Sequence, residues 1–150
     1  MSEHIATIEW SAGEGDVAAN TYTRAHSWHF DGGLTVPGSA SPSVVPEPYS
    51  DPKAVDPEEA FVAALSSCHM LWFLDLARRA GFTAARYIDA AKGHMVNDAG
   101  TVWISKVELH PTVTWTGEAP DAQKLEELHH AAHQACFLAN SVKTEVTTVL

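Results

Sequence analysis

Two cysteines, Cys68 and Cys136, are the side chains of this sequence best suited to nucleophilic or redox chemistry. The spacing of 68 residues excludes a CxxC motif, but a fold could still bring the two thiols together. A disulfide needs Cα atoms within about 7 Å, a separation that two packed helices can supply. A cysteine is equally at home as a small hydrophobic residue of a core. The cysteines therefore indicate either thiol chemistry or ordinary packing.

Nine histidines offer a second chemistry, metal binding. His129 and His133 are one helical turn apart, Cys136 follows a turn later, and His26 and His69 could join them. Such a Cys/His set could bind zinc. The segment lacks the glutamate of an HExxH motif, which argues against a catalytic zinc of that type. The plainer interpretation is surface histidines on a polar helix face, with one or two in a core.

Cys68 lies in a predicted helix over residues 57–79. Asp56 suits the N-cap, Pro57 suits the first helical position, and Glu59 completes a capping box. Residues at helical spacing form an apolar stripe that should face a core or an interface. The stripe consists of Phe61, Leu65, Cys68, Trp72 and Leu76.

Cys136 lies in a second predicted helix, over residues 121–140, with Asn140 as the expected C-cap. The apolar face of this helix consists of Leu125, Leu128, Ala132 and Cys136. Both cysteines thus lie on the apolar faces of the two long helices. Packing of these helices on each other would bring Cys68 and Cys136 close together.

The rest of the chain predicts strands and one long loop. Five segments are expected to be strands: residues 4–11, 22–30, 86–95, 101–115 and 142–150. A phase change within the fourth segment indicates a β-bulge. Residues 37–57 hold six of the eight prolines, which favours a loop with at most a short edge strand near Val44. The order strands, helix, hairpin, helix, strand predicts an α+β fold.

Composition limits the partners of the chain. With 150 residues, 45% of them apolar and 19% charged, it should form one soluble globular domain spanning residues 1–150. The net charge of −10 argues against nucleic acid or an anionic membrane as partner. We also expect no membrane span and no signal peptide. A cytoplasmic location follows by default, and thiols stay reduced there.

Two segments resemble the OsmC/Ohr family of osmotically inducible and organic hydroperoxide resistance proteins. Residues 57–68 are similar to the Pro-Glu helix opening that runs into the family's reactive cysteine. Residues 132–140 are similar to the segment that carries its second cysteine, and residues 22–26 lie where the family keeps an arginine. The resemblance covers nearly the whole chain. It implies an α+β intertwined homodimer with active sites at its interface.

The resemblance also implies an activity, that of a cysteine-based peroxidase reducing organic hydroperoxides in oxidative-stress defence. Cys68 would attack the peroxide, Cys136 would resolve the oxidised thiol, and Arg24 and Glu58 would be the activating pair. A dithiol, thioredoxin-like or lipoyl reductant would close the cycle without a cofactor or metal. Phe137 stands where the family has proline, which indicates a divergent subgroup. A non-catalytic protein that binds small ligands or senses redox state remains the alternative.

Helix geometry constrains that arrangement. Cys68 lies well beyond the first turn, where the helix dipole acts, so a cation such as Arg24 must stabilise its thiolate. Ten residues separate Glu58 from Cys68, which corresponds to about 15 Å of helical rise. Either the helix breaks, or Glu58 reaches the site of another chain; we predict a site shared across a dimer interface. His69, about 100° around the helix, is expected at the edge of the pocket.

The expected substrate follows from the apolar residues near the cysteines. They would form a wall that suits an organic hydroperoxide better than hydrogen peroxide. The wall consists of Phe61, Leu65, Leu71, Trp72 and Phe137.

Overall fold

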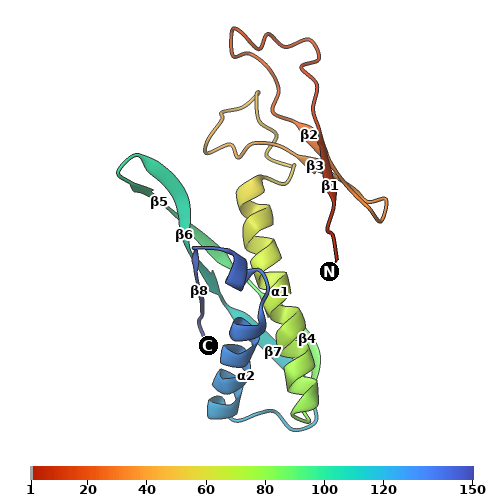
Figure 1. The fold of residues 1–150 in the computed structure, drawn as a ribbon, viewed down its shortest axis with the longest axis vertical. Coiled ribbons are helices and arrows are strands. Elements are labelled where there is room, and N and C mark those ends of the chain that lie inside the picture. Colours follow the sequence, from red (N-terminus) through yellow and green to blue (C-terminus); the bar gives the residue numbers. More distant parts are fainter. Residues whose placement is uncertain (1) are drawn as a thin grey trace. The chain divides into compact units, whose positions relative to one another are not determined.

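The structure, a computed structural model, describes residues 2–150. The chain divides into two compact units, one up to Ala60 and one from Phe61 (Figure 1). We call them the N-terminal and C-terminal units. That the whole chain acts as a single domain stays a prediction.

The N-terminal unit is built on a three-stranded antiparallel sheet in the order β1-β2-β3. Its strands are β1 (Ala6–Glu9), β2 (His26–Phe30) and β3 (Thr35–Gly38). The Gly-rich turn between β2 and β3 forms a hairpin, with Gly33 at φ +85°. The segment that contains Arg24 leads directly into β2 of this sheet.

Two predictions for this unit are wrong. The strand expected from residue 22 begins only at His26, because the backbone N–H of Arg24 donates to the Tyr49 carbonyl of the Pro-rich loop instead of to the sheet. The short edge strand expected near Val44 is a turn, whose N–H groups at Val44 and Val45 both donate to Ser41. Pro37 lies instead in β3, an edge strand of the sheet, where proline is tolerated. On the outer side of β3 the Pro37 carbonyl accepts from the Val55 N–H at 3.0 Å.

Helix α1 (Pro57–Arg79) begins with the predicted capping box. The backbone N–H of Glu59 donates to Asp56 Oδ1 at 2.7 Å, and Glu59 Oε2 accepts from the N–H of Asp56 at 3.3 Å. Of the predicted apolar stripe, Leu65 is fully buried, and Phe61, Trp72 and Leu76 are partly buried against the core, as expected. The fully buried residues are Leu65, His69, Phe73 and Ala77. They repeat every fourth residue, so the buried face is turned by about one residue from the expected one.

The C-terminal unit holds two sheets. One pairs β4 (Thr83–Asp89) with β7 (Pro111–Thr116), and the other has the order β5-β6-β8. The second sheet consists of β5 (Lys92–Asp98), β6 (Thr101–Leu109) and β8 (Glu145–Thr148). β5 and β6 are antiparallel, whereas β8 runs parallel to β6. The bulge predicted in β6 is confirmed, because His94 pairs with Lys106 and Met95 with Ile104, which leaves Ser105 unpaired.

The strands predicted over residues 86–95 and 101–115 are each divided between two strands of different sheets. The first breaks after Asp89 and the second at His110. The Asp89 carboxylate accepts from the His110 backbone N–H at 2.6 Å and from the Ser66 hydroxyl of α1 at 2.5 Å. One side chain therefore satisfies the polar backbone at the break and ties it to α1.

Helix α2 (Ala122–Ala135) has Asp121 as its N-cap and ends five residues before the predicted limit. Its C-cap is Cys136, whose ψ of 112° turns the chain out of the helix. Asn140 still acts on this end, because its side-chain amide donates to the Gln134 carbonyl at 3.0 Å. A short 3₁₀ turn, η1 (Ala139–Ser141), follows. The shorter helix places Cys136 at a chain reversal.

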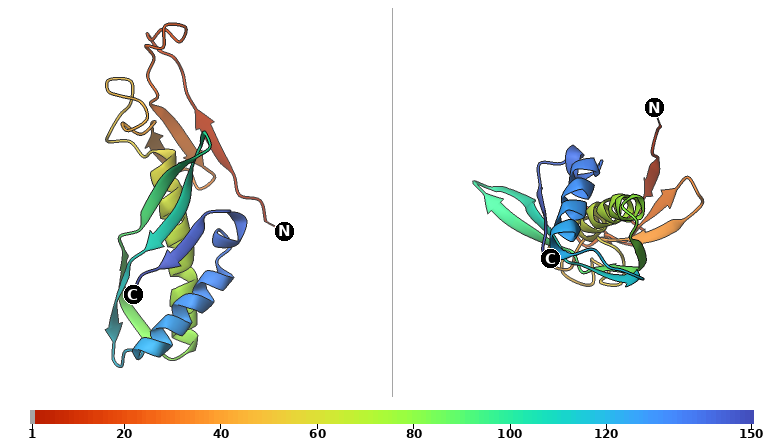
Figure 2. Two further views of the ribbon diagram at one scale, coloured as in Figure 1. Left: turned by 90° about the vertical axis from the view of Figure 1, so that its left-hand side faces the viewer. Right: turned by 90° about the horizontal axis from the view of Figure 1, so that it is seen from below.

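The core of the C-terminal unit has two parts, both built on α1 (Figure 2). One lies between α1 and α2 and buries Phe73, Ala77, Leu128 and Ala132. The other lies between α1 and β6 and buries Leu65, Val107 and Leu109. The α1–α2 contact, which sequence periodicity predicted, positions the candidate site.

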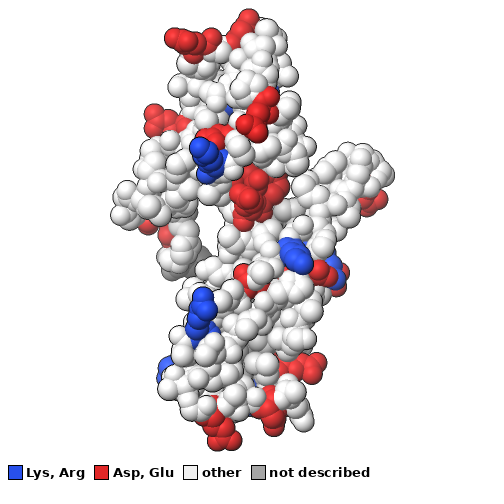
Figure 3. Space-filling model, turned by 180° about the vertical axis from the view of Figure 1, so that it is seen from behind, with Lys and Arg blue, Asp and Glu red and all other residues white. Residues whose placement is uncertain are grey.

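Contrary to the sequence expectation, α1 is long and apolar enough to cross a membrane by length and composition, with a mean hydropathy of 1.5 over its most apolar window. The core helix of a soluble protein passes the same test, so this is weak evidence of a span. On the face drawn in Figure 3, carboxylates are spread widely and Lys and Arg form no cluster.

Candidate functional site

The two cysteines meet where α1 and α2 pack. Cys68 is half-buried on α1, and Cys136, at the end of α2, is 1% exposed. Both are free thiols, and they are neighbours in the structure. Burial first, and then the neighbouring Cys68 side chain, raise the pKa of the Cys136 thiol. The structure therefore brings the predicted pair together, whereas the roles of attacking and resolving thiol stay predictions.

Antiparallel packing of α1 and α2 produces this meeting (Figure 1). The ring of Trp72 contacts the ring of Phe137 edge-on, with centroids 5.5 Å apart, one turn beyond Cys68. The backbone N–H of Ala139 donates to Cys136 Sγ at 3.4 Å, which holds this thiol against the following turn. An aromatic pair thus flanks the two thiols.

Only part of the predicted apolar wall can meet a substrate. Leu65 is fully buried in the α1–β6 core and Phe61 packs against it, so neither forms an open surface. Leu71 is exposed and Phe137 is 68% exposed. The apolar surface nearest the thiols is therefore Phe137 with its neighbour Trp72.

Arg24 belongs to the N-terminal unit. Its guanidinium donates to the Tyr22 carbonyl and to Asn20 Oδ1, both at 2.5 Å, and lies 3.7 Å from the centre of the Tyr22 ring. It lines a pocket of about 520 Å³. The other lining residues are Trp10, Val17, Tyr22, His26, Ser39, Ala40 and Pro57. Arg24 is therefore held as a fixed cation in a mostly apolar pocket.

Glu58 does not pair with Arg24. Within residues 2–150 no ion pair involves either side chain, and Glu58 Oε2 is buried without a hydrogen-bond partner. Helix α1 is unbroken from Pro57 to Arg79, so the alternative in which it breaks between Glu58 and Cys68 is excluded. The other alternative, a Glu58 that reaches the site of another chain, stays a prediction.

The prediction that His69 lies at the edge of a pocket is wrong. Its side chain is buried between α1 and α2, with 1% exposed. Its Nε2 lies 3.0 Å from Nδ1 of His129, which is 2% exposed, and the ring of Phe73 stacks on His129 at 4.0 Å. Burial is the main cause that lowers the pKa of each histidine to about 4. Apolar periodicity did not indicate this position, because a histidine does not count toward an apolar stripe.

The histidines predicted as metal ligands do not meet in one cluster. His26 accepts a hydrogen bond from the Trp28 indole in the N-terminal unit, and His129 pairs with His69. In the part of the chain that the structure describes, no three His, Cys, Asp or Glu side chains are placed to hold one ion. His130 and His133 instead line a pocket of about 740 Å³ between α2 and β8.

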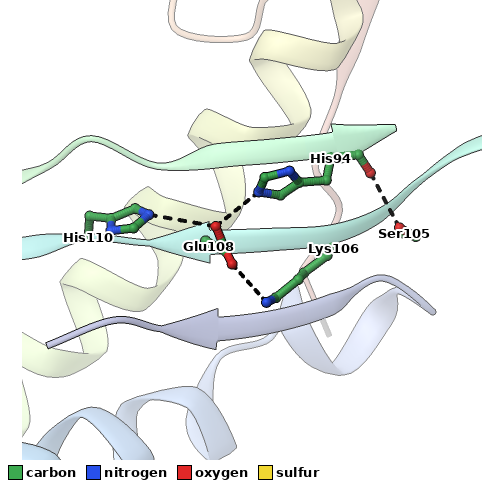
Figure 4. Close-up of polar contacts among 5 residues, drawn as sticks. All are labelled: His94, Ser105, Lys106, Glu108 and His110. Carbon is green, nitrogen blue, oxygen red and sulfur yellow. Dashed lines mark hydrogen bonds and ion pairs between the residues drawn. The ribbon is translucent and has the colours of Figure 1, made fainter. Parts of the chain in front are cut away.

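A second polar cluster, which the sequence analysis did not single out, lies on the β5–β6 hairpin (Figure 4). Glu108 accepts from Lys106 Nζ at 2.7 Å and contacts His94 Nε2 at 3.0 Å, while His110 Nε2 is 3.9 Å away. The Lys106 bond first, then the His94 bond, lower the pKa of Glu108 to about 2. Because Glu108 alternates with buried Val107, the cluster faces away from the core and supports the hairpin.

Comparison with solved structures places the fold. An OsmC-like protein of unknown function from Vibrio cholerae is 49% identical, with 99% of each chain covered and a TM-score of 0.95. Organic hydroperoxide resistance proteins are more distant. That of Elizabethkingia anophelis is 18% identical (99% and 96% covered, TM-score 0.71), and OhrB of Bacillus subtilis is also 18% identical (98% and 96% covered, TM-score 0.69). They confirm the predicted α+β fold.

No protein with a curated function matches the chain. The sequence pattern of the family described as OsmC-like protein matches residues 50–150, which include α1, both cysteines and α2. With the identity to the Vibrio cholerae protein over the whole chain, this confirms the resemblance seen in the cysteine segments. The chain belongs to the OsmC-like family.

Proposed function

We propose that this protein is a thiol-dependent peroxidase that reduces organic hydroperoxides through Cys68 and Cys136 in defence against oxidative stress. The observation that carries the proposal is that the two free thiols, one on α1 and one at the end of α2, are neighbours. Family relatives named as hydroperoxide resistance proteins support it.

The proposed cycle needs only the two thiols and a reductant. The Cys68 thiolate attacks one peroxide oxygen, which becomes a sulfenic acid on Cys68 while the second oxygen leaves as the alcohol after taking a proton. The Cys136 thiol then displaces the sulfenic hydroxyl, so that a disulfide and water form. A dithiol, thioredoxin-like or lipoyl, reduces this disulfide by exchange and is itself oxidised to a disulfide. Cys68 attacks because it is the more accessible thiol.

Substrate and assembly follow from the surroundings of the thiols. The exposed Phe137 ring and the half-buried Trp72 give an organic hydroperoxide an apolar surface. Among the described residues Glu58 Oε2 is buried without a hydrogen-bond partner, and no carboxylate pairs with Arg24. These two observations support a homodimer in which the two groups complete sites across the interface. A reduced cytoplasm would keep the thiols ready to react.

The experiment that tests the proposal is thiol counting. The reduced protein is mixed with one equivalent of cumene hydroperoxide, stopped at intervals with an alkylating reagent, and examined by mass spectrometry. We expect rapid loss of two thiols per chain and a Cys68–Cys136 peptide. Thiols that survive minutes of exposure would refute the peroxidase and favour the non-catalytic alternative, a small-ligand-binding or redox-sensing protein.

Replacing Arg24 by methionine is expected to slow the reaction of the protein with cumene hydroperoxide at pH 7 by about tenfold or more. Without a nearby cation, an ordinary cysteine is only about 3% thiolate at pH 7. Stopped-flow peroxide consumption measures the rate. R24K, which keeps the charge but not the planar fork, should lose less activity. Equal rates for wild type, R24M and R24K would remove Arg24 from the site.

A further inference from the structure

The buried stripe of α1 contains one polar residue, His69, which lies between Leu65 and Phe73 in the four-residue repeat. The facing side of α2 also contains one, His129, beside Leu128 and Ala132. The two rings are nearly coplanar, with 3° between their planes and 3.0 Å between His69 Nε2 and His129 Nδ1. A hydrogen-bonded histidine pair thus crosses a helix–helix contact whose other buried residues in the core are apolar.

Such a pair resists sliding of one helix along the other. Both rings are neutral at pH 7, so one N–H and one lone pair meet between them. The outer nitrogens, His69 Nδ1 and His129 Nε2, have no partner within the described chain. A shift of one turn, about 5.4 Å, would leave the inner nitrogens unpaired too. Leaving buried polar groups without a hydrogen-bond partner destabilises such a shifted register, whereas Ala and Leu side chains tolerate repacking.

The register of the two helices decides whether the thiols meet. Cys68 directly precedes His69 on α1, and Cys136 follows His129 by seven residues, two turns of α2. The helices run antiparallel, so a slip of one turn would carry Cys136 about 5 Å away from Cys68. A disulfide tolerates a spread of only about 2 Å in its Cα separation. The histidine pair and the cysteine pair therefore depend on the same register.

We propose that His69 and His129 are positioning residues, whose hydrogen bond fixes the register of α2 on α1 and so holds Cys136 against Cys68 for disulfide formation. The proposal rests on the proposed function, since it assumes that these two thiols form the disulfide of the cycle. It assigns the histidines no contact with the peroxide. A buried polar pair that selects one register of two helices is a known use of such groups.

The test measures the disulfide without peroxide. Wild type and variants are equilibrated in mixtures of reduced and oxidised dithiothreitol, which exchanges two electrons with Cys68 and Cys136, and the disulfide fraction is read by alkylation and mass spectrometry. For the double variant H69L/H129L we expect the equilibrium constant for disulfide formation to fall at least about tenfold, or about 1.4 kcal/mol. Its unfolding midpoint should match wild type, because apolar replacement of a buried polar pair is often neutral.

Rescue and control variants separate positioning from general packing. H69Q places an amide nitrogen where His69 Nε2 lies, so its equilibrium constant for disulfide formation should stay within about threefold of wild type. H69M is of similar size but has no hydrogen-bond donor, so its equilibrium constant should fall as far as that of the double variant. H130Q alters an exposed histidine of the same helix, whose one side-chain hydrogen bond among the described residues is to Gln134, and its disulfide equilibrium should equal that of wild type. If H69L/H129L does not fold, the comparison of H69M with H69Q decides.

Three results would overturn the proposal. The first is a folded H69L/H129L with an unchanged disulfide equilibrium, and the second is the same equilibrium constant for disulfide formation in H69M and H69Q. The third is a wild-type protein that forms no disulfide in the dithiothreitol buffers. Failure of the proposed function would look different. In that case wild type would form the disulfide in dithiothreitol buffers, yet its thiols would survive cumene hydroperoxide.

Discussion

Replacement of Cys68 by serine is expected to slow the reaction with cumene hydroperoxide at least about 100-fold, leaving Cys136 reduced. The remaining thiol is 1% exposed, and burial raises its pKa above the ordinary value, so less of it is thiolate at pH 7 than of an exposed cysteine. Peroxide has little access to it. Loss of free thiol after one equivalent of peroxide, followed by stopped alkylation, measures the effect.

Cys136→Ser should behave differently, and the contrast identifies the two roles. Cys68 should still react once, at close to the wild-type rate, but its sulfenic acid has no thiol to condense with. Dimedone should therefore trap the sulfenic acid, and excess peroxide should oxidise it further to sulfinic acid. Turnover with a dithiol should fall steeply. Serine keeps an acceptor for the Ala139 N–H, so the end of α2 should stay intact.

The two serine variants control for each other. Both should show the wild-type circular dichroism spectrum and similar unfolding midpoints, since each replaces one thiol by a hydroxyl of similar size. If Cys68→Ser consumed peroxide at the wild-type rate, Cys136 would be the attacking thiol. If Cys136→Ser gave no sulfenic acid, Cys68 would not react with peroxide at all.

Local patterns predicted most of the elements correctly. The capping box from Asp56 to Glu59 and the bulge in β6 are set by neighbouring residues, so a short stretch of sequence contains the information. The same holds for the meeting of Cys68 and Cys136, which needed only two amphipathic helices that pack on each other.

The errors arose where a distant partner decides. Nothing in residues 86–95 shows that Asp89 will accept from His110 and end the strand there. The fully buried face of α1 is turned by about one residue from the predicted stripe, because strand β6 packs on one side of the helix and α2 on another. A helix with two partners buries more than one stripe, and periodicity alone cannot choose between them.

Apolar periodicity also gave no indication of the histidine pair. Nothing near His69 in the sequence shows that its partner lies 60 residues away, at His129. The spacing along the second helix instead paired His129 with His133. The roles of Arg24 and Glu58 were the hardest part of the predicted site to derive from the sequence, because only the family resemblance implied them. Within residues 2–150 the two side chains do not bind each other.

The second large effect is expected on acidification, where the folded protein should lose on the order of 3 kcal/mol between pH 6.5 and pH 4. Burial is the first cause that lowers the pKa of His69 and His129 to about 4. For His69 the nearby His133 lowers the pKa further and Asp89 raises it. A shift of this size corresponds to about 3 kcal/mol for one histidine, and the two coupled rings are treated as one group.

The sign follows from proton binding. Above pH 6.5 the two rings are neutral in both the folded and the unfolded chain, so their contribution to stability is complete. Between pH 6.5 and pH 4 the unfolded chain binds protons that the folded chain does not, so the free energy of unfolding falls with pH. Below about pH 4 the folded rings also titrate and the loss levels off. Glu108, with its pKa lowered to about 2, adds a separate loss only below about pH 4.5.

Urea unfolding at pH 7.5, 6.5, 5.5 and 4.5 measures this dependence, with far-UV circular dichroism as the readout. H69L/H129L removes both titrating rings, so the fall in its free energy of unfolding over this range should be much smaller than in wild type. H130Q should keep the wild-type slope, because His130 is exposed. If wild type and H69L/H129L lost stability in parallel, another group would be taking up the proton, and the pair would not be the buried neutral contact that joins α1 to α2.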